Sequence, residues 1–382
     1  MNRVVHVVDA FLARSETFIY NYVTSHRRYE AHVLCRRREN QDEFPFDRVS
    51  VVSEAESRRQ ARWWVARGLE NLTGTRPWTR QAERLVAEIA PSVIHAHFGP
   101  NGCAVLPIAQ RLRIPLVTTF YGVDIAVLPH LPKWKARYAA LFSAGDVFLA
   151  EGPEMRRKAI AAGAPPDRTE LQPIAIHIDR YPRWEPIDGQ KVVLFVGRLI
   201  EKKGLVYAVQ AFARVRAAVP RLMLRVVGDG PEMASAREIV RREELTPYVT
   251  FLGMQPHARV LDELRRAHVL VHPSVTALDG DSEGGAPTIL LEAQAIGTPI
   301  VSTVHADIPN IVDAGAAVRL CPERDVDALT AALVEVLAHP MRVDAAFVRA
   351  HHDVAREIDR LEARYDQVRA ARAPAVVHAT SR

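Results

Sequence analysis

The chain has 382 residues, of which 48% are hydrophobic and 25% are charged, and its formal net charge is +5. This composition is typical of a folded protein with two sizeable domains and excludes disordered and fibrous classes. No apolar run reaches the roughly 18 residues of a membrane span, and the start lacks the features of a signal peptide. The three cysteines, Cys35, Cys103 and Cys321, have neither metal-binding nor disulfide spacing. We therefore expect a cytoplasmic protein.

Short apolar runs alternate with helical patterns along nearly the whole chain, which predicts parallel sheets covered by helices. In the first half the expected strands are 4–8, 31–35, 92–97, 115–120 and 146–150. In the second half they are 191–197, 222–228, 248–253, 268–274, 299–303 and 317–321. Helical spacing of apolar residues between them, as in 204–219, predicts the covering helices. Each half is therefore predicted to be a doubly wound α/β domain.

The alternation is interrupted by prolines and polar residues, and we expect a linker at about 175–190. The predicted parts are an N-terminal Rossmann-like domain (1–178) and a C-terminal one (179–345). A C-terminal helix (346–371) is expected to pack back on the N-terminal domain, and 372–382 to form a flexible tail. Two such domains face each other across a cleft, and ligands bind beyond the carboxyl ends of the strands.

Positive charge is concentrated in the first half of the chain. Read as a helix, Arg58–Arg67 places Arg59, Trp63 and Arg67 in one row, which suits peripheral contact with an anionic membrane surface or an acidic acceptor. A solvated face with Trp63 or Trp64 packed inward is the alternative. Aromatic residues make up only 7% of the chain, so a basic groove with stacking rings is not expected and nucleic acid is excluded as a partner.

Cations follow the strand expected at 191–197. Arg198, Lys202 and Lys203 stand in the loop between this strand and a helix that opens at Gly204. Such a loop suits an anionic group, and the guanidinium fork fits phosphate oxygens. Surface charge is the alternative for all three, and Arg198 is the strongest candidate because it directly follows the strand.

A second anion site is predicted in the stretch "DGDSEGGAPTILLE", residues 279–292. Pro287 suits the first turn of a helix, and Gly284 and Gly285 leave the backbone before it uncovered. The unpaired N–H groups of the helix start would cradle a diphosphate. Glu292 lies one turn after Thr288 on the same helix face, where it could accept the hydroxyls of a bound ribose.

Several linked motifs together resemble glycosyltransferase family 4, retaining enzymes of the GT-B fold. In the second half they are "GRLIEKKG", "GDGP", "FLG" and "PSVTALDGDSEGGAPTILLEAQAIGTPIVST". In the first half "SETFIYNYV", "HAHFGPNG" and "TTFYGVDI" resemble the branch with colanic-acid and other exopolysaccharide glycosyltransferases. The resemblance covers roughly residues 1–340. It implies that a glycosyl group is transferred from a nucleotide-diphosphate sugar to an acceptor hydroxyl with retention of the anomeric configuration. A UDP-sugar is favoured over a GDP-sugar as the donor. Neither a metal nor a cofactor is expected to take part.

The resemblance implies a role for each residue of these motifs. Arg198 and Lys203 would contact the diphosphate, Glu283 the donor sugar, Glu292 the ribose and Met254 the base. Arg198, Lys203 and Glu283, with His97, are the candidate catalytic residues. The donor-binding set as a whole is Gly197, Arg198, Lys203, Met254, Glu283, Gly284, Gly285, Ala286, Pro287, Thr288 and Glu292.

The first half supplies candidates for binding the acceptor or the sugar. His95 and His97 alternate onto one strand face; His95 is expected to be buried and hydrogen-bonded, whereas His97, at the carboxyl end, is the cleft candidate. A metal would need a third ligand, which the local sequence does not offer. Asp124 either binds hydroxyls or caps a turn. The remaining candidates are Tyr121, Glu16 and Ser15, and Ser15 is equally suited to cap a helix.

The sequence departs from the family pattern in three places. Eight residues rather than seven separate Glu283 from Glu292, Tyr121 stands where histidine is common, and Asn310 where an acidic residue is frequent. The first two would also fit a catalytically silent, glycan-binding partner subunit.

Several enzyme alternatives stay open at this point. The first alternative is a transferase that reacts by double displacement through Glu283. The second is a metal-dependent transferase that binds the metal with Asp279 and Asp281. The third is a sugar-nucleotide epimerase. An oxidoreductase is excluded because no strand leads into G-x-G-x-x-G. The acceptor is expected to be a glycan or lipid-linked sugar at the inner face of the membrane, with a soluble small molecule as the alternative.

Overall fold

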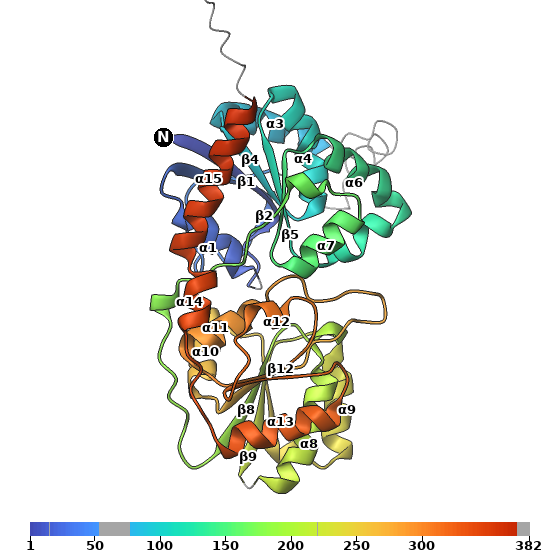
Figure 1. Ribbon diagram of the computed structural model, residues 1–382, viewed down its shortest axis with the longest axis vertical. Coiled ribbons are helices and arrows are strands. Elements are labelled where there is room, and N and C mark those ends of the chain that lie inside the picture. Colours follow the sequence, from blue (N-terminus) through green and yellow to red (C-terminus); the bar gives the residue numbers. More distant parts are fainter. Residues whose placement is uncertain (15, 53–76, 220, 373–382) are drawn as a thin grey trace, which may run out of the picture.

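The structure is a computed structural model that describes residues 1–14, 16–52, 77–219 and 221–372. It has two lobes stacked along the long axis, the first half of the chain forming one and the second half the other (Figure 1). The predicted basic segment Arg58–Arg67 lies outside the described residues. Among the helices that are described, none combines the length and apolar character needed to cross a membrane.

The N-terminal lobe is built on a seven-stranded parallel sheet with the strand order β3-β2-β1-β4-β5-β6-β7. The strands β4, β5 and β6 are buried at every position, as expected for a sheet covered on both faces. The strands are β1 (Asn2–Phe11), β2 (Tyr29–Arg38), β3 (Val49–Val51), β4 (Val93–His97), β5 (Leu116–Phe120), β6 (Val147–Ala150) and β7 (Thr169–Leu171).

Helices pack on both faces of this sheet (Figure 1). α4 begins after Phe98, the residue that follows β4, and ends at Leu112; the next residue, Arg113, takes the left-handed conformation. The helices of the lobe are α1 (Thr17–Ser25), α3 (Pro77–Ile89), α4 (Gly99–Leu112), α5 (Val123–Ala126), α6 (Pro132–Ala144) and α7 (Pro153–Ala161).

The C-terminal lobe repeats this plan with a six-stranded parallel sheet in the order β10-β9-β8-β11-β12-β13. Its strands are β8 (Lys191–Val196), β9 (Leu222–Val227), β10 (Val249–Gly253), β11 (Val269–His272), β12 (Ile300–Thr303) and β13 (Val318–Cys321). Its helices are α8 (Leu205–Ala218), α9 (Glu232–Arg242), α10 (His257–Arg266), α11 (Thr288–Ile296), α12 (Ile308–Ile311) and α13 (Val326–Ala338). In both sheets the order reverses beside the first strand, so each lobe has a switch point where ligands bind in this fold.

The predicted α/β architecture of two doubly wound domains is confirmed, and each predicted strand is present. β3 and β7 were not predicted. Each is a three-residue strand at an edge of the sheet, too short to show the alternation by which strands are recognised.

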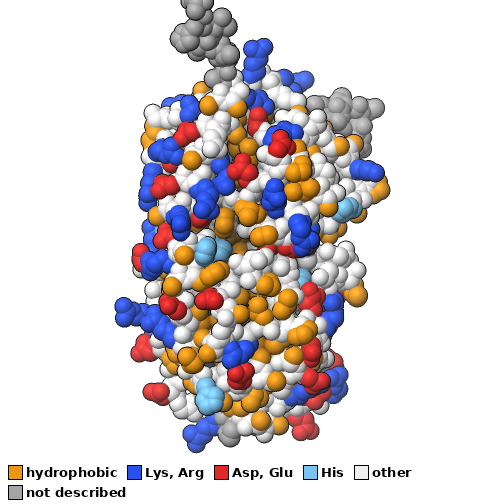
Figure 2. Space-filling view, in the orientation of Figure 1, with side chains coloured by type: hydrophobic (Ala, Val, Ile, Leu, Met, Phe, Trp, Pro, Cys, Tyr) orange, Lys and Arg blue, Asp and Glu red, His pale blue; other side chains and the backbone are white. Residues whose placement is uncertain are grey.

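The end of the chain forms two helices, α14 (Ala346–His352) and α15 (Val354–Arg372), rather than the single helix expected for 346–371. They separate at Asp353, whose side chain accepts the N–H of Ala355 and whose backbone pairs with Ile176. α15 lies against the N-terminal lobe beside α1 (Figure 1). On the face shown in Figure 2, positive and negative side chains are interspersed over this lobe.

The docking of α15 predicts a strong dependence of stability on its inward face. Leu361 is fully buried there, and Leu361→Ala should lower the free energy of unfolding by about 2–5 kcal/mol because a cavity is left. Asp359→Ala, on the same helix with 58% of its side chain exposed, is the matched control and should stay within about 0.5 kcal/mol. Urea unfolding measures both, and equal, small losses would contradict the docked helix.

Candidate active site

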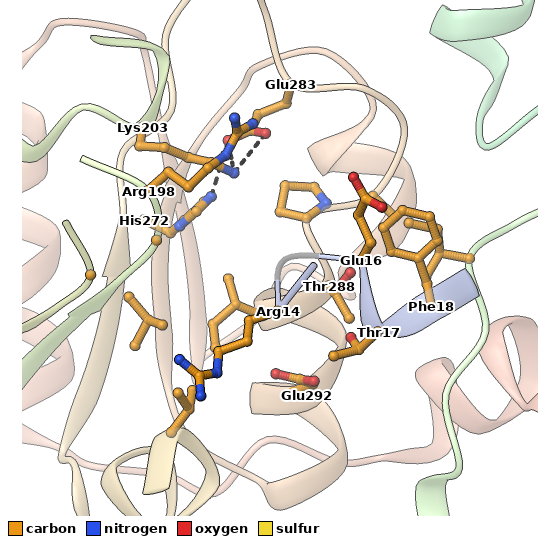
Figure 3. Close-up of a pocket in the computed structure, with 18 of the residues that line it drawn as sticks. Arg14, Glu16, Thr17, Phe18, Arg198, Lys203, His272, Glu283, Thr288 and Glu292 are labelled. Carbon is orange, nitrogen blue, oxygen red and sulfur yellow. Dashed lines mark hydrogen bonds and ion pairs between the residues drawn. The ribbon is translucent and has the colours of Figure 1, made fainter. Parts of the chain in front are cut away.

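A pocket lies between the two lobes, and its walls are the carboxyl ends of strands from both sheets. The N-terminal lobe contributes the loop after β1 and the residues that follow β4, β5 and β6. The C-terminal lobe contributes the residues that end or follow β8, β9, β10 and β11, and the start of α11. Figure 3 shows side chains from both lobes directed into the same space, among them Arg14, Glu16, Phe18, Arg198, Lys203, Glu283 and Glu292.

The cations after β8 have different environments. Arg198 is exposed and lines the pocket, and no hydrogen bond or ion pair joins its guanidinium to another described residue. Lys202 is 6% exposed; its Nζ lies 3.0 Å from Asp281 Oδ1 and 2.9 Å from the carbonyl oxygen of Ser282. Arg198 is therefore available to a ligand, whereas Lys202 holds the loop that leads to Glu283.

Glu283 is the centre of a buried cluster at the pocket wall. Its Oε1 lies 2.7 Å from Lys203 Nζ and accepts a hydrogen bond from Ser274 Oγ at 2.8 Å. His272, the last residue of β11, lies 3.3 Å from the same oxygen (Figure 3). Burial alone would raise the pKa of Glu283, but Lys203, His272 and Lys202 together outweigh it and hold the pKa well below the usual value. Glu283 is therefore an ionised carboxylate with a fixed orientation.

Glu292 lies at the other side of the pocket on α11 and is paired with a histidine. His257 Nε2, at the start of α10, lies 2.8 Å from Glu292 Oε1. Burial would lower the pKa of His257, but the hydrogen bond and charge of Glu292 outweigh it and raise the pKa. The Tyr181 hydroxyl also donates to Glu292, at 3.4 Å.

The glycine turn before α11 forms one of the contacts between the two lobes. A Cβ atom on Gly284 would come closer than 3.0 Å to the carbonyl of Tyr121, and one on Gly285 would collide with the side chain and backbone of Glu151. Gly285 N–H donates to Glu151 Oε2 at 2.7 Å. These glycines therefore permit the close approach of the lobes.

Most of the predicted site residues line this pocket, and three described ones do not. Gly285 lies behind the wall against Glu151, Asp124 accepts the N–H groups of Gly99, Tyr121 and Gly122, and His97 is buried. Asp124 thus has the capping role. Those in the pocket are Glu16, Tyr121, Gly197, Arg198, Lys203, Met254, Glu283, Gly284, Ala286, Pro287, Thr288 and Glu292; Ser15 lies outside the described residues.

The prediction that His97 faces the cleft is wrong. Its side chain is 0% exposed, with Nε2 2.9 Å from His6 Nδ1 and Nδ1 2.6 Å from the Tyr121 hydroxyl. Tyr121 directly follows β5 and lies across the end of β4, so it stands between His97 and the pocket. The expected burial of His95 is confirmed: it bonds the hydroxyls of Tyr365 and Thr119.

His6, the third histidine of this group, comes from β1 and pairs in register with His95. His6, His95 and His97 place ring nitrogens within 4.8 Å of one another, a proximity that strand order alone creates and local spacing does not reveal. Their nitrogens hydrogen-bond to other side chains, and the rings of His95 and His97 are stacked, with centroids 4.4 Å apart.

Sequence reasoning missed Glu151, His257 and His272 in the pocket wall. His272 ends a predicted strand, so its position at the carboxyl edge was a usable signal. Glu151 follows β6 and His257 is the first residue of α10, and neither has a distinctive spacing in the sequence. Asn310, where an acidic residue is frequent, donates to Asp307 and lies outside the pocket.

Comparison with known proteins identifies related sequences for both lobes. Residues 16–180 match the family model described as Glycosyltransferase Family 4, and residues 190–339 match Glycosyl transferases group 1. The chain is 33% identical over 273 residues to a colanic acid biosynthesis glycosyltransferase, WcaL, of Salmonella typhimurium, covering 70% of this chain and 67% of that one. It is 29% identical over 251 residues to the amylovoran biosynthesis glycosyltransferase AmsK of Erwinia amylovora, covering 65% and 61%.

Solved structures show the same fold as this chain. Anabaena HepE, in complex with UDP and glucose, superposes with a TM-score of 0.78 at 16% identity, covering 96% of this chain and all of that one. The lipopolysaccharide outer core galactosyltransferase WaaB gives a TM-score of 0.69 at 14% identity, covering 96% and 99%. The expected GT-B fold is thereby confirmed.

The interlobe contact predicts that glycine is required at position 285. Gly285→Ala should force the lobes apart, because the new Cβ would overlap Glu151, and should raise the radius of gyration in small-angle scattering. Gly315→Ala is the matched control, since nothing lies within 4 Å of a Cβ there. Unchanged scattering for both variants would contradict the observed contact.

Glu16 predicts a pH dependence of stability. Burial raises its pKa from 4.5 to about 7, against the opposing charge of Arg198. The folded protein therefore holds this proton longer than the unfolded chain, and the resulting stability, full below pH 4.5, is lost as pH rises through 7. Relative to Glu16→Gln, the wild-type Tm should fall between pH 5 and 8; a constant difference across that range would refute the raised pKa.

Proposed function

The chain belongs to glycosyltransferase family 4, and on that premise we propose that it transfers a hexosyl group from a UDP-sugar to an acceptor hydroxyl with retention of configuration. The observation that carries the proposal is the convergence of the exposed Arg198, the Lys203–Glu283 pair and the start of α11 in one interlobe pocket. Cations and free helix N–H groups together suit a diphosphate.

The diphosphate would lie between Arg198 and the start of α11. Pro287 has no N–H of its own, and the N–H groups of Thr288 and Ile289 have no partner among the described residues, whereas that of Leu290 donates to the Pro287 carbonyl. As the glycosyl bond breaks, negative charge grows on the diphosphate, and Arg198 and the helix start stabilise that charge more than the ground state. Lys203, next to them, adds positive charge to the same region.

The nucleoside would extend toward α10. Glu292 is held by His257 and keeps Oε2 for a ribose hydroxyl, a pairing that suits a carboxylate. Met254, 49% exposed at the end of β10, stands at the pocket wall where the base would lie. The preference for UDP draws support from HepE, whose structure holds UDP and glucose.

The pairing of Glu283 favours a mechanism without a protein nucleophile. Its Oε1 already contacts Lys203 and Ser274, so the ionised carboxylate is oriented to hold Lys203 and to accept sugar hydroxyls. The leaving phosphate oxygen, on the attacked face, would take the proton of the acceptor hydroxyl. The sugar would then keep its configuration without a glycosyl-enzyme bond.

The acceptor is proposed to be a growing glycan or lipid-linked sugar in exopolysaccharide biosynthesis. The names of WcaL and AmsK, which concern colanic acid and amylovoran, support this pathway class. Acceptor binding would use the N-terminal side of the pocket, near Glu16 and Tyr121. Peripheral contact with a membrane through Arg58–Arg67, a cytoplasmic location and independence of metal belong to the same proposal.

Titration calorimetry with UDP and with GDP tests the proposal. UDP should bind the wild-type protein more tightly than GDP, and Arg198→Ala should weaken UDP binding by about ten- to a hundredfold, because a charge-assisted hydrogen bond is lost. Arg241→Ala, an exposed residue of α9 in the same lobe, is the matched control and should bind UDP as the wild type does. Binding that is equal in the wild type and Arg198→Ala would contradict the proposed diphosphate site.

A further inference from the structure

A continuous chain of hydrogen-bonded side chains runs through the N-terminal lobe from α15 to the pocket wall. Glu362 Oε1 lies 3.0 Å from His26 Nδ1, and His26 Nε2 lies 2.9 Å from His6 Nε2. His6 Nδ1 lies 2.9 Å from His97 Nε2, and His97 Nδ1 lies 2.6 Å from the Tyr121 hydroxyl. The five residues come from five different segments of the chain, and only Tyr121 lines the pocket.

The charge states of these side chains set the direction in which the hydrogen bonds of the series are donated. Burial would raise the pKa of Glu362, but His26 and the N–H groups of Arg27 and Arg28 outweigh it and lower the pKa to about 2. Burial lowers the pKa of His26, and lowers those of His6 and His97 well below the usual value. An ionised carboxylate can only accept, and a neutral imidazole donates from one nitrogen and accepts at the other.

These constraints leave one arrangement of protons. His26 donates from Nδ1 to Glu362 and accepts at Nε2 from His6 Nε2–H. His6 then accepts at Nδ1 from His97 Nε2–H, and His97 accepts at Nδ1 from the Tyr121 hydroxyl. The proton of Tyr121 is therefore directed into the lobe and away from the pocket.

We propose that Glu362, His26, His6 and His97 form a directional relay that positions Tyr121, so that Tyr121 serves the pocket through its ring and carbonyl and not through its hydroxyl. The ring is held between Phe18 and Phe98, with centroids 4.8 and 4.7 Å away. The carbonyl forms the surface against which Gly284 packs. The four relay residues are positioning residues, since none of them lines the pocket.

This relay rests on the proposed function for its effect on ligands. Tyr121 stands opposite the Gly284 backbone, beside the place proposed for the sugar end of a UDP-sugar, whereas the ribose is proposed to lie at Glu292. A displaced Tyr121 should therefore weaken binding of the sugar but not of the nucleotide. Through the relay, Glu362 on α15 would help to hold the pocket wall that the N-terminal lobe forms at Tyr121.

Nitrogen NMR of histidine-labelled full-length protein tests the direction of the relay. We expect the Nδ1–H tautomer at His26 and the Nε2–H tautomer at His6 and His97, all neutral at pH 7. His352, whose Nδ1 donates to the Ile174 carbonyl at 2.7 Å, is an internal reference outside the relay. Tyr121→Phe should change the signals of His97 and leave those of His26 and His352. Imidazolium signals, the opposite tautomers, or a bound transition metal would overturn the relay.

A double-mutant cycle tests its effect on the pocket. Tyr121→Phe and Glu362→Ala should each weaken UDP-glucose binding about three- to tenfold and change UDP binding less than about twofold, and the double variant should match the single ones. Asp366→Ala, on the same helix and bonded to the Tyr29 hydroxyl at 2.6 Å, should leave the ratio of the two affinities unchanged. Additive losses, or equal losses for UDP, would overturn the positioning role. A wild-type protein that binds neither nucleotide would instead refute the proposed function, and the tautomers would still decide the relay.

Discussion

The contact of the Gly284–Gly285 turn with the N-terminal lobe is the constraint on which the rest of the site depends. It brings Tyr121 and Glu151 of one sheet within contact of the turn that precedes α11 in the other. Without it, the carboxyl ends of the two sheets would form two half-sites. A second contact lies at the start of α7, where the N–H groups of Glu154 and Met155 donate to the Asp307 carboxylate of the C-terminal lobe at 2.9 and 3.0 Å. Together with the glycine contact, it sets the width of the pocket.

The C-terminal half of the site could be predicted from the sequence because its parts are local. Arg198 and Lys203 lie two and seven residues after the end of β8, and Glu283 and Glu292 lie on either side of one turn, Glu292 within α11. The ion pair between Lys203 and Glu283 was not predictable, because it joins the ends of β8 and β11, which become neighbours only through the strand order. The sequence predicts that the glycines leave the backbone open to a ligand, but it does not show that the opposite lobe packs against them.

The N-terminal half could be predicted less well for the same reason. His97 was correctly placed at the end of a strand, yet the strand order puts Tyr121 over it and His6 beside it. Its polar groups are thereby used within the lobe. Tyr121 stands where histidine is common in the family, and its hydroxyl contacts the buried imidazole of His97. The polar contacts to a sugar would then come mainly from Glu283 and its neighbours.

A crystal structure of the protein with UDP would show directly where the diphosphate binds. We predict the diphosphate between the Arg198 guanidinium and the first N–H groups of α11, with the ribose hydroxyls at Glu292. A well-ordered UDP bound outside the interlobe pocket, or in it with the phosphates away from Arg198, would contradict the proposed donor site.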